Sequence, residues 1–242
     1  MNKITTFLEE IRSFCREHAD PVIVAKYARY FKEGYDAWGV SNELIQAKRA
    51  EMLPALKACS LEEMIDLGNQ LWTSGKYEEG NFAIWLAMGR KKEYTAQNFQ
   101  EIGKWLDTFI INWAHTDALC SELLPVYVNL GIVGLSDFDS WRSAPSIWKR
   151  RAVPVTLIKP MKKGFDLQSI LAFLDPMMMS PEKPIQQGLG WFLREAWNRH
   201  PAEVEPFLLK WKEHCGRVII QYATEKMKAE DKLNYRRSKK GK

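Results

Sequence analysis

The sequence has no apolar run long enough to cross a membrane and no cluster of cysteines. None of its hydrophobic stretches approaches the ~18 residues that a membrane-spanning helix requires. The first residues carry charges throughout, so we expect no secretory signal peptide. The four cysteines lie far apart, without a Cys-x-x-Cys pair or a histidine at metal-ligand spacing. This pattern favours reduced thiols in a cytoplasmic protein over disulfides or a zinc site. We expect no metal and no other cofactor.

The sequence also lacks a convincing pair of β-strands and any linker rich in Gly, Ser or Pro. Apolar residues instead recur at spacings of three and four, as in the stripe from Ile4 to Cys15. Helix starts are indicated by Ser41, by a capping box at Ser60–Glu63 and by Thr95. We expect about twelve helices in one domain over residues 1–236, followed by a disordered basic tail at 237–242.

Pairs of predicted helices recur at about 40 residues, which is the period of HEAT and armadillo repeats. The repeat in the sequence itself is weak, so the prediction depends on the number and spacing of the helices. We predict an all-α, HEAT-like helical-repeat solenoid of about six antiparallel helix pairs with a concave basic face. A compact helical bundle is the alternative.

Positive charge is concentrated in one stretch that contains no acid. The chain carries a net charge of +5, yet seven basic residues and no Asp or Glu lie between Arg142 and Lys163. They are Arg142, Lys149, Arg150, Arg151, Lys159, Lys162 and Lys163. A polyanion such as DNA is the natural partner of this segment, although a solvated face is the alternative.

The basic segment is predicted to be mostly helical, entered at Pro145 after Ser143. Pro154 lies inside it and should kink the helix, because proline removes one backbone hydrogen bond. Trp141 and Trp148 flank the cluster, and aromatic residues beside arginine are typical of nucleic-acid surfaces.

Trp113 and Asp117 are four residues apart and would share one face of a helix. Helical geometry puts Asp117 at the edge of an apolar stripe, where an unpaired carboxylate is costly and requires a cation or a function. The alternative is that Asp117 is a helix-end residue near the positive end of the helix dipole.

A second unusual segment surrounds Trp191, which has Gly188 and Gly190 on its N-terminal side. Each glycine inside a helix costs about 1 kcal/mol relative to alanine. Their presence indicates either a ligand that lies close to Trp191 or tight packing between helices.

Three short segments match the signatures of a known family in their order and spacing. They are Asn112–Asp117, Trp148–Ala152 and Gly190–Glu195, with looser matches at Tyr30–Lys32 and Trp38–Val40. Together they resemble the DNA alkylation repair enzymes, the AlkD-like HEAT-repeat DNA glycosylases. The resemblance extends from about residue 22 to about residue 200.

The resemblance implies a glycosylase of base excision repair that hydrolyses the N-glycosidic bond of cationic N3- or N7-alkylated purines in duplex DNA. It implies that Asp117 stabilises the oxocarbenium-like sugar and positions water, with Trp113 and Trp191 lining one cleft as cation–π partners. Arg151 would hold a DNA phosphate. The other residues expected at the DNA are Arg150, Lys149, Tyr30, Lys159, Lys162 and Lys163.

We expect a monomer with no membrane and no obligate protein partner, located in the cytoplasm with the chromosomal DNA. Two rival interpretations stay open. One is a non-catalytic HEAT-repeat protein that recognises distorted or branched DNA. The other is a helical-repeat scaffold that binds proteins.

Overall fold

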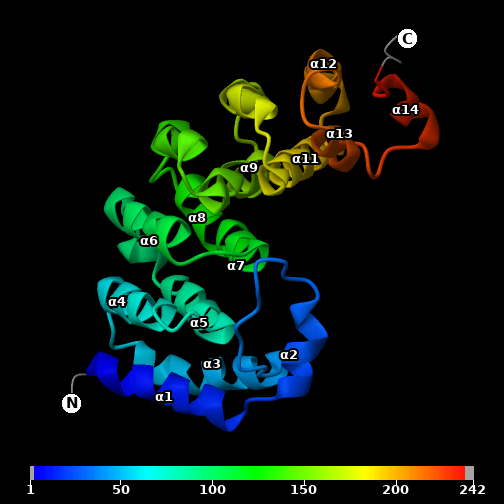
Figure 1. Cartoon of the computed structure of the whole chain (residues 1–242). Coiled ribbons are helices and arrows are strands. Elements are labelled where there is room, and N and C mark those ends of the chain that lie inside the picture. Colours follow the sequence, from blue (N-terminus) through cyan, green and yellow to red (C-terminus); the bar gives the residue numbers. More distant parts are fainter. Residues whose placement is uncertain (1–2, 238–242) are drawn as a thin grey trace. The chain divides into compact units, whose positions relative to one another are not determined.

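The computed structural model describes residues 3–237 of the chain, and every regular element in that range is helical (Figure 1). Fourteen α-helices and several short 3₁₀ turns follow one another, and no β-strand occurs among these residues. The prediction of an all-α fold is therefore confirmed. No helix in the described range combines the length and the apolar character that a bilayer span would need.

The chain divides into two compact units, Met1–His115 and Thr116–Lys242. The prediction of one repeat domain over residues 1–236 stays a prediction, and most of the predicted tail, residues 238–242, lies outside the described residues. The helices of the first unit are α1 (Lys3–Glu17), α2 (Pro21–Ala28), α3 (Asn42–Leu56), α4 (Leu61–Trp72), α5 (Tyr77–Ala87) and α6 (Ala96–Thr108). Helix α7 (Trp113–Ala118) starts in the first unit and ends in the second.

Helices α3, α4 and α6 begin at the residues that the sequence indicates. Ser41, Ser60 and Thr95 each accept a hydrogen bond from a backbone amide of the following turn, and Ser60 forms the expected capping box with Glu63. These side chains satisfy amides that have no partner inside the helix. The apolar stripe of α1 is buried against α4 and α5, which also pack on each other.

In the second unit, α7 leads through a π-helical turn (Leu119–Leu123) into the remaining helices. These are α8 (Leu124–Asn129), α9 (Ile147–Lys162), α10 (Leu167–Leu174), α11 (Lys183–Trp197), α12 (Pro201–Trp211), α13 (Arg217–Ala223) and α14 (Ala229–Asn234). Helix α11 packs against both α9 and α13. The four cysteines of the chain are buried, and none forms a disulfide within the described range.

Two helices of the second unit differ from the prediction. The basic helix begins at Ile147 rather than at Pro145, because Ser146 is its N-cap and accepts a hydrogen bond from the Lys149 amide at 3.3 Å. The sequence also predicts one helix from Gly216 to about Tyr235, but the structure divides this stretch into α13 and α14. The division follows Thr224, whose hydroxyl donates to the Ile220 carbonyl at 2.9 Å, a bond that weakens a helix.

Candidate functional site

Asp117 lies in α7, and Arg151 from α9 binds its carboxylate on both oxygens. The Nε and Nη2 atoms of Arg151 donate to Oδ1 and Oδ2 of Asp117 at 2.9 and 2.8 Å. The side chains are 7% exposed for Arg151 and 18% exposed for Asp117. The carboxylate at the edge of the apolar stripe therefore has a cation as its partner. Such a two-point, charge-assisted pair fixes the orientation of both side chains.

The third nitrogen of the Arg151 guanidinium is also engaged. Its Nη1 donates to the Pro184 carbonyl in the first turn of α11 at 2.7 Å. Gly188, one turn further along α11, leaves room for the arginine, since a Cβ there would lie 3.3 Å from Arg151 Cγ. Every nitrogen of the guanidinium is thus directed at a protein acceptor. The predicted contact between Arg151 and a DNA phosphate stays a prediction, and it would require Arg151 to exchange these partners.

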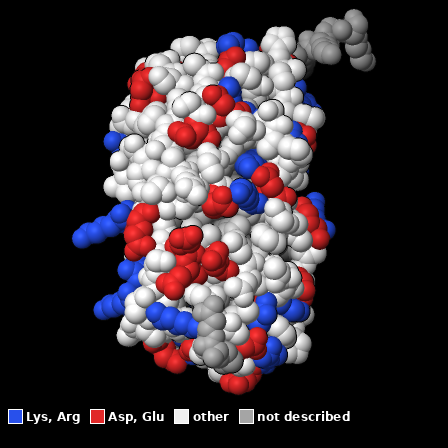
Figure 2. Space-filling model, turned by 90° about the vertical axis from the view of Figure 1, so that its left-hand side faces the viewer, with Lys and Arg blue, Asp and Glu red and all other residues white. Residues whose placement is uncertain are grey.

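Most of the basic segment is neutralised by carboxylates from outside the segment. Ion pairs join Arg142 to Asp139 (2.7 Å), Arg150 to Glu182 (2.8 Å), Arg151 to Asp117, Lys159 to Glu122 (3.3 Å) and Lys162 to Glu195. At least five of the seven basic residues of this segment are therefore paired with a carboxylate. Figure 2 shows a face of the molecule on which basic and acidic atoms are likewise interspersed.

The aromatic residues that flank the basic segment do not face the solvent. Trp141 is fully buried and Trp148 is 6% exposed. The Lys149 ammonium lies over the Trp141 ring, 5.0 Å from its centroid. The expectation that these two tryptophans mark a nucleic-acid surface is therefore wrong, because buried rings cannot stack on bases. The charges that stay exposed on α9 and its end are those of Lys159, Lys162 and Lys163.

The pair of Lys162 and Glu195 should weaken in acid. Partial burial alone would raise the pKa of Glu195, but the hydrogen bond and charge of Lys162, together with Arg194, lower it below its ordinary value of 4.5. A group whose pKa is lowered on folding stabilises the fold above its unfolded pKa and loses that contribution as the pH falls. Between neutral and acidic pH, the free energy of unfolding should fall less in Glu195→Gln than in the wild-type protein. The difference should be at most about 1 kcal/mol. Urea unfolding at neutral and acidic pH measures this, and identical pH dependence in both proteins would contradict it.

Trp191 is half-buried on α11, and its side chain forms a hydrogen bond with Glu195. The glycines before it serve helix packing. A Cβ on Gly190 would lie 2.5 Å from Tyr222 Cβ and 2.8 Å from the Ile219 carbonyl oxygen of α13. Tight packing therefore accounts for Gly188 and Gly190 without a ligand, and the role of Trp191 stays a prediction.

The packing of α11 predicts unequal effects for two alanine substitutions. Gly190→Ala should lower the free energy of unfolding by about 1–3 kcal/mol, because its Cβ would displace backbone atoms of α13. Gly188→Ala should cost clearly less, since its nearest contacts are 3.3 Å or longer and alanine gains about 1 kcal/mol of helix propensity. Urea unfolding of the two variants compares them. Equal losses would show that contact with α13 does not determine the cost.

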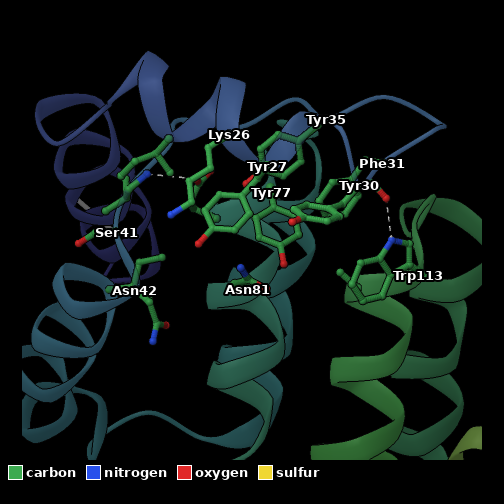
Figure 3. Close-up of a pocket in the computed structure, with 15 residues that line it drawn as sticks. Lys26, Tyr27, Tyr30, Phe31, Tyr35, Ser41, Asn42, Tyr77, Asn81 and Trp113 are labelled. Atoms are coloured by element: carbon green, nitrogen blue, oxygen red, sulfur yellow. Dashed lines mark hydrogen bonds between the residues drawn. The ribbon is translucent and has the colours of Figure 1, made fainter.

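In the first unit, Trp113 is held against the segment that follows α2. Its indole Nε1 donates to the Tyr30 carbonyl at 3.1 Å, and its ring stacks on Phe31 at 5.7 Å between centroids and 16° between planes. The Trp113 side chain is nonetheless 42% exposed. Both Trp113 and Tyr30 line a pocket of about 680 Å³ whose other aromatic residues are Tyr27, Phe31, Tyr35 and Tyr77 (Figure 3).

A buried carboxylate holds the loop that bounds this pocket. Glu78, in the first turn of α5, accepts the amides of Trp38 (2.8 Å), Gly39 (2.8 Å) and Val40 (3.2 Å). Gly39 adopts φ +84°, and a Cβ there would lie 2.1 Å from the Asp20 carbonyl oxygen, so only glycine fits. The role of Glu78 could not be predicted from the sequence, because an acid in the first turn of a helix is already explained by the helix dipole.

His115 joins the start of α7 to α5. Its ring stacks on Tyr77 at 4.6 Å, and its Nε2 lies 2.9 Å from the Tyr77 carbonyl oxygen. Burial lowers the pKa of His115 to about 4, so the imidazole is neutral at neutral pH. His115 therefore adds no positive charge beside the pocket.

The predicted site residues fall into two groups. Trp113 and Tyr30 belong to the first unit, whereas Asp117, Trp191 and the basic segment belong to the second. The expectation that Trp113 and Trp191 line one cleft stays a prediction. Over residues 3–237, no three His, Cys, Asp or Glu side chains are grouped so that they could hold a metal ion.

Comparison with known proteins gives three results. The model of a family described as DNA alkylation repair enzyme matches residues 11–227. A solved structure, described as a predicted DNA alkylation repair enzyme from Enterococcus faecalis, superposes with a TM-score of 0.77 at 17% identity, over 88% of this chain and 98% of that one. A search of curated proteins finds no significant match. The structural similarity shows that the two proteins share a helical-repeat fold.

Proposed function

The chain belongs to the DNA alkylation repair enzyme family, and we propose that it is a DNA glycosylase acting on cationic N3- and N7-alkylated purines in duplex DNA. The observation that supports this most directly is the carboxylate of Asp117, which Arg151 holds at two points in a largely buried setting. An anion fixed in this way can meet positive charge that develops on a substrate without first reorienting.

The proposed reaction begins with a base that already carries a positive charge. Alkylation at N3 or N7 makes the purine a good leaving group, because the base takes the electron pair of the glycosidic bond and departs neutral. Positive charge then passes to the deoxyribose, and water adds to C1′ with loss of a proton. Each oxygen of Asp117 keeps a lone pair beyond the one that Arg151 uses, so the carboxylate can face the sugar cation and accept a hydrogen bond from water.

The tryptophans have a matching role in this proposal. An indole face attracts a cationic base or sugar by about 0.5–2 kcal/mol, depending on how well water is excluded. Trp113 is the more accessible of the two, since it is 42% exposed. Its stacking on Phe31 fixes the position of the ring. Trp191 is half-buried and would contribute through whatever part of its ring stays accessible.

DNA is the proposed partner, and its phosphates are the proposed ligands of the exposed basic residues. Lys159, Lys162 and Lys163 are exposed, whereas Lys149 and Arg150 are half-buried. We propose that Tyr30, which is 52% exposed, also contacts the DNA backbone. The protein would act as a monomer on chromosomal DNA in the cytoplasm.

Release of alkylated bases tests the proposed activity. The protein is incubated with a methylated duplex and with the same duplex unmethylated, and the released bases are separated by chromatography. We expect methylated purines to appear with time from the first duplex alone. The Asp117–Arg151 pair would also suit a purely structural role. The alternative is therefore a non-catalytic protein that binds DNA and uses this pair only for stability. DNA binding without any base release would favour it.

A further inference from the structure

Helix α2 and the residues after it carry positive charge that is not neutralised by the protein. The stretch Pro21–Lys32 contains Lys26, Arg29 and Lys32 and no acid. All three side chains are exposed, and none forms an ion pair within the part of the chain that the structure describes. The segment from Arg142 to Lys163 differs in this respect, since at least five of its seven basic residues are paired. The charges of α2 are therefore available for an anionic ligand.

The same segment forms one wall of the aromatic pocket. Tyr27 and Tyr30 line the pocket although they are 41% and 52% exposed. Large aromatic side chains that stay open to solvent around a hollow are typical of surfaces on which a flat ligand stacks. The pocket volume of about 680 Å³ lies within the range of about 300–1,000 Å³ usual for small-ligand sites.

Polar groups lie opposite the aromatic wall. Ser41, Asn42 and Asn81 line the pocket, and Figure 3 shows the labelled tyrosines above the two asparagines in that view. An asparagine amide offers both donors and an acceptor, and it can pair with the edge of a nucleobase. The pocket thus combines stacking faces, groups for a base edge and cations for a phosphate.

We propose that this pocket binds a single unpaired nucleotide of DNA, with its base against Tyr27 and its phosphate at Lys26 or Arg29. A paired base is covered on both faces by its neighbours, so only an unpaired or extruded base can enter. The inference rests on DNA being the ligand, as in the proposed function, but it does not depend on hydrolysis.

Two duplexes of the same sequence test the pocket, one fully paired and one with a single-nucleotide bulge. Binding of the full chain is measured by fluorescence anisotropy. Wild-type protein should bind the bulged duplex about tenfold more tightly, which is the range expected for stacking one base on an aromatic side chain. Tyr27→Ala should reduce this preference to about twofold or less, with little change for the paired duplex.

Val22→Ala is the matched control. Val22 lies in the same helix, is 73% exposed and does not line the pocket, so its loss should leave the preference for the bulged duplex intact. Lys26→Ala should weaken binding to the bulged duplex and reduce the dependence of its log affinity on log salt by about one unit, whereas Tyr27→Ala should leave that slope unchanged. The two substitutions thus separate contact with the base from contact with phosphate.

Three outcomes would overturn the inference. They are equal wild-type affinity for the two duplexes, an unchanged preference in Tyr27→Ala, and binding of free deoxyadenosine monophosphate as tight as that of the bulged duplex. The last outcome would identify a free nucleotide, rather than DNA, as the ligand. If wild-type protein releases methylated bases without preferring the bulge, only this inference is wrong. If it prefers the bulge and releases no base, only the proposed hydrolysis is wrong.

Discussion

Asp117→Asn should reduce the rate of base release from methylated duplex DNA by on the order of 10²–10³-fold, which corresponds to about 2.7–4 kcal/mol. The substitution keeps the shape of the side chain and removes its charge. DNA affinity should stay the same or rise slightly, because a carboxylate repels phosphates in the bound state. Toward the substrate, the charge is stabilising only when the sugar becomes cationic, so its loss raises the barrier rather than weakening DNA binding. Single-turnover release and anisotropy with the same duplex measure the two quantities separately.

The contact with Arg151 complicates this variant. An asparagine offers the buried guanidinium one acceptor oxygen instead of two charged ones, so the variant should also be less stable. Rates must therefore be compared at a temperature at which both proteins are fully folded, as circular dichroism can verify. Glu122→Gln is the matched control, since it removes a carboxylate five residues away that pairs with exposed Lys159. Its rate should stay within about twofold of wild type. A wild-type rate in Asp117→Asn would mean that the carboxylate only holds Arg151.

Local patterns predicted the helices because the responsible groups are neighbours in the chain. The N-caps at Ser41, Ser60 and Thr95 and the buried stripe of α1 depend on residues within one or two turns. The split between α13 and α14 was not predicted, because the apolar pattern is that of one continuous helix. The hydrogen bond from the Thr224 hydroxyl to the Ile220 carbonyl, which weakens a helix, is not visible in that pattern.

The candidate site was less predictable because its partners come from distant parts of the chain. A segment without acids was expected to be strongly basic, but Asp117, Glu122, Glu182 and Glu195 reach it from other elements. Likewise, the three amides that Glu78 binds lie about 40 residues before it. The net charge of a sequence segment therefore differs from the charge at its surface in the folded protein, because residues from distant parts of the chain form ion pairs with it.

Arg151→Ala should lower the free energy of unfolding by about 3 kcal/mol, the lower end of the range for removing one partner of a buried ion pair. The reason is that Asp117 would keep its charge in a site only 18% exposed, and the Pro184 carbonyl would lose its donor. Lys163→Ala, at the exposed end of α9, should change stability by no more than about 0.5 kcal/mol. Urea unfolding of both variants gives the comparison.

DNA binding by the same variant shows whether the Arg151 guanidinium binds a DNA phosphate or stays on Asp117. From the sequence alone, Arg151→Ala is expected to weaken binding to all DNA sequences alike and to flatten the salt dependence by about one unit. An arginine that stays on Asp117 and the Pro184 carbonyl contacts no phosphate, so its removal should leave the slope of log affinity against log salt unchanged while the protein loses stability. A slope reduced by about one unit, together with the same loss of stability in the free protein, would show that Arg151 exchanges Asp117 for a phosphate when DNA binds. That exchange would release the Asp117 carboxylate beside the sugar, and catalysis would then be coupled to binding through this ion pair.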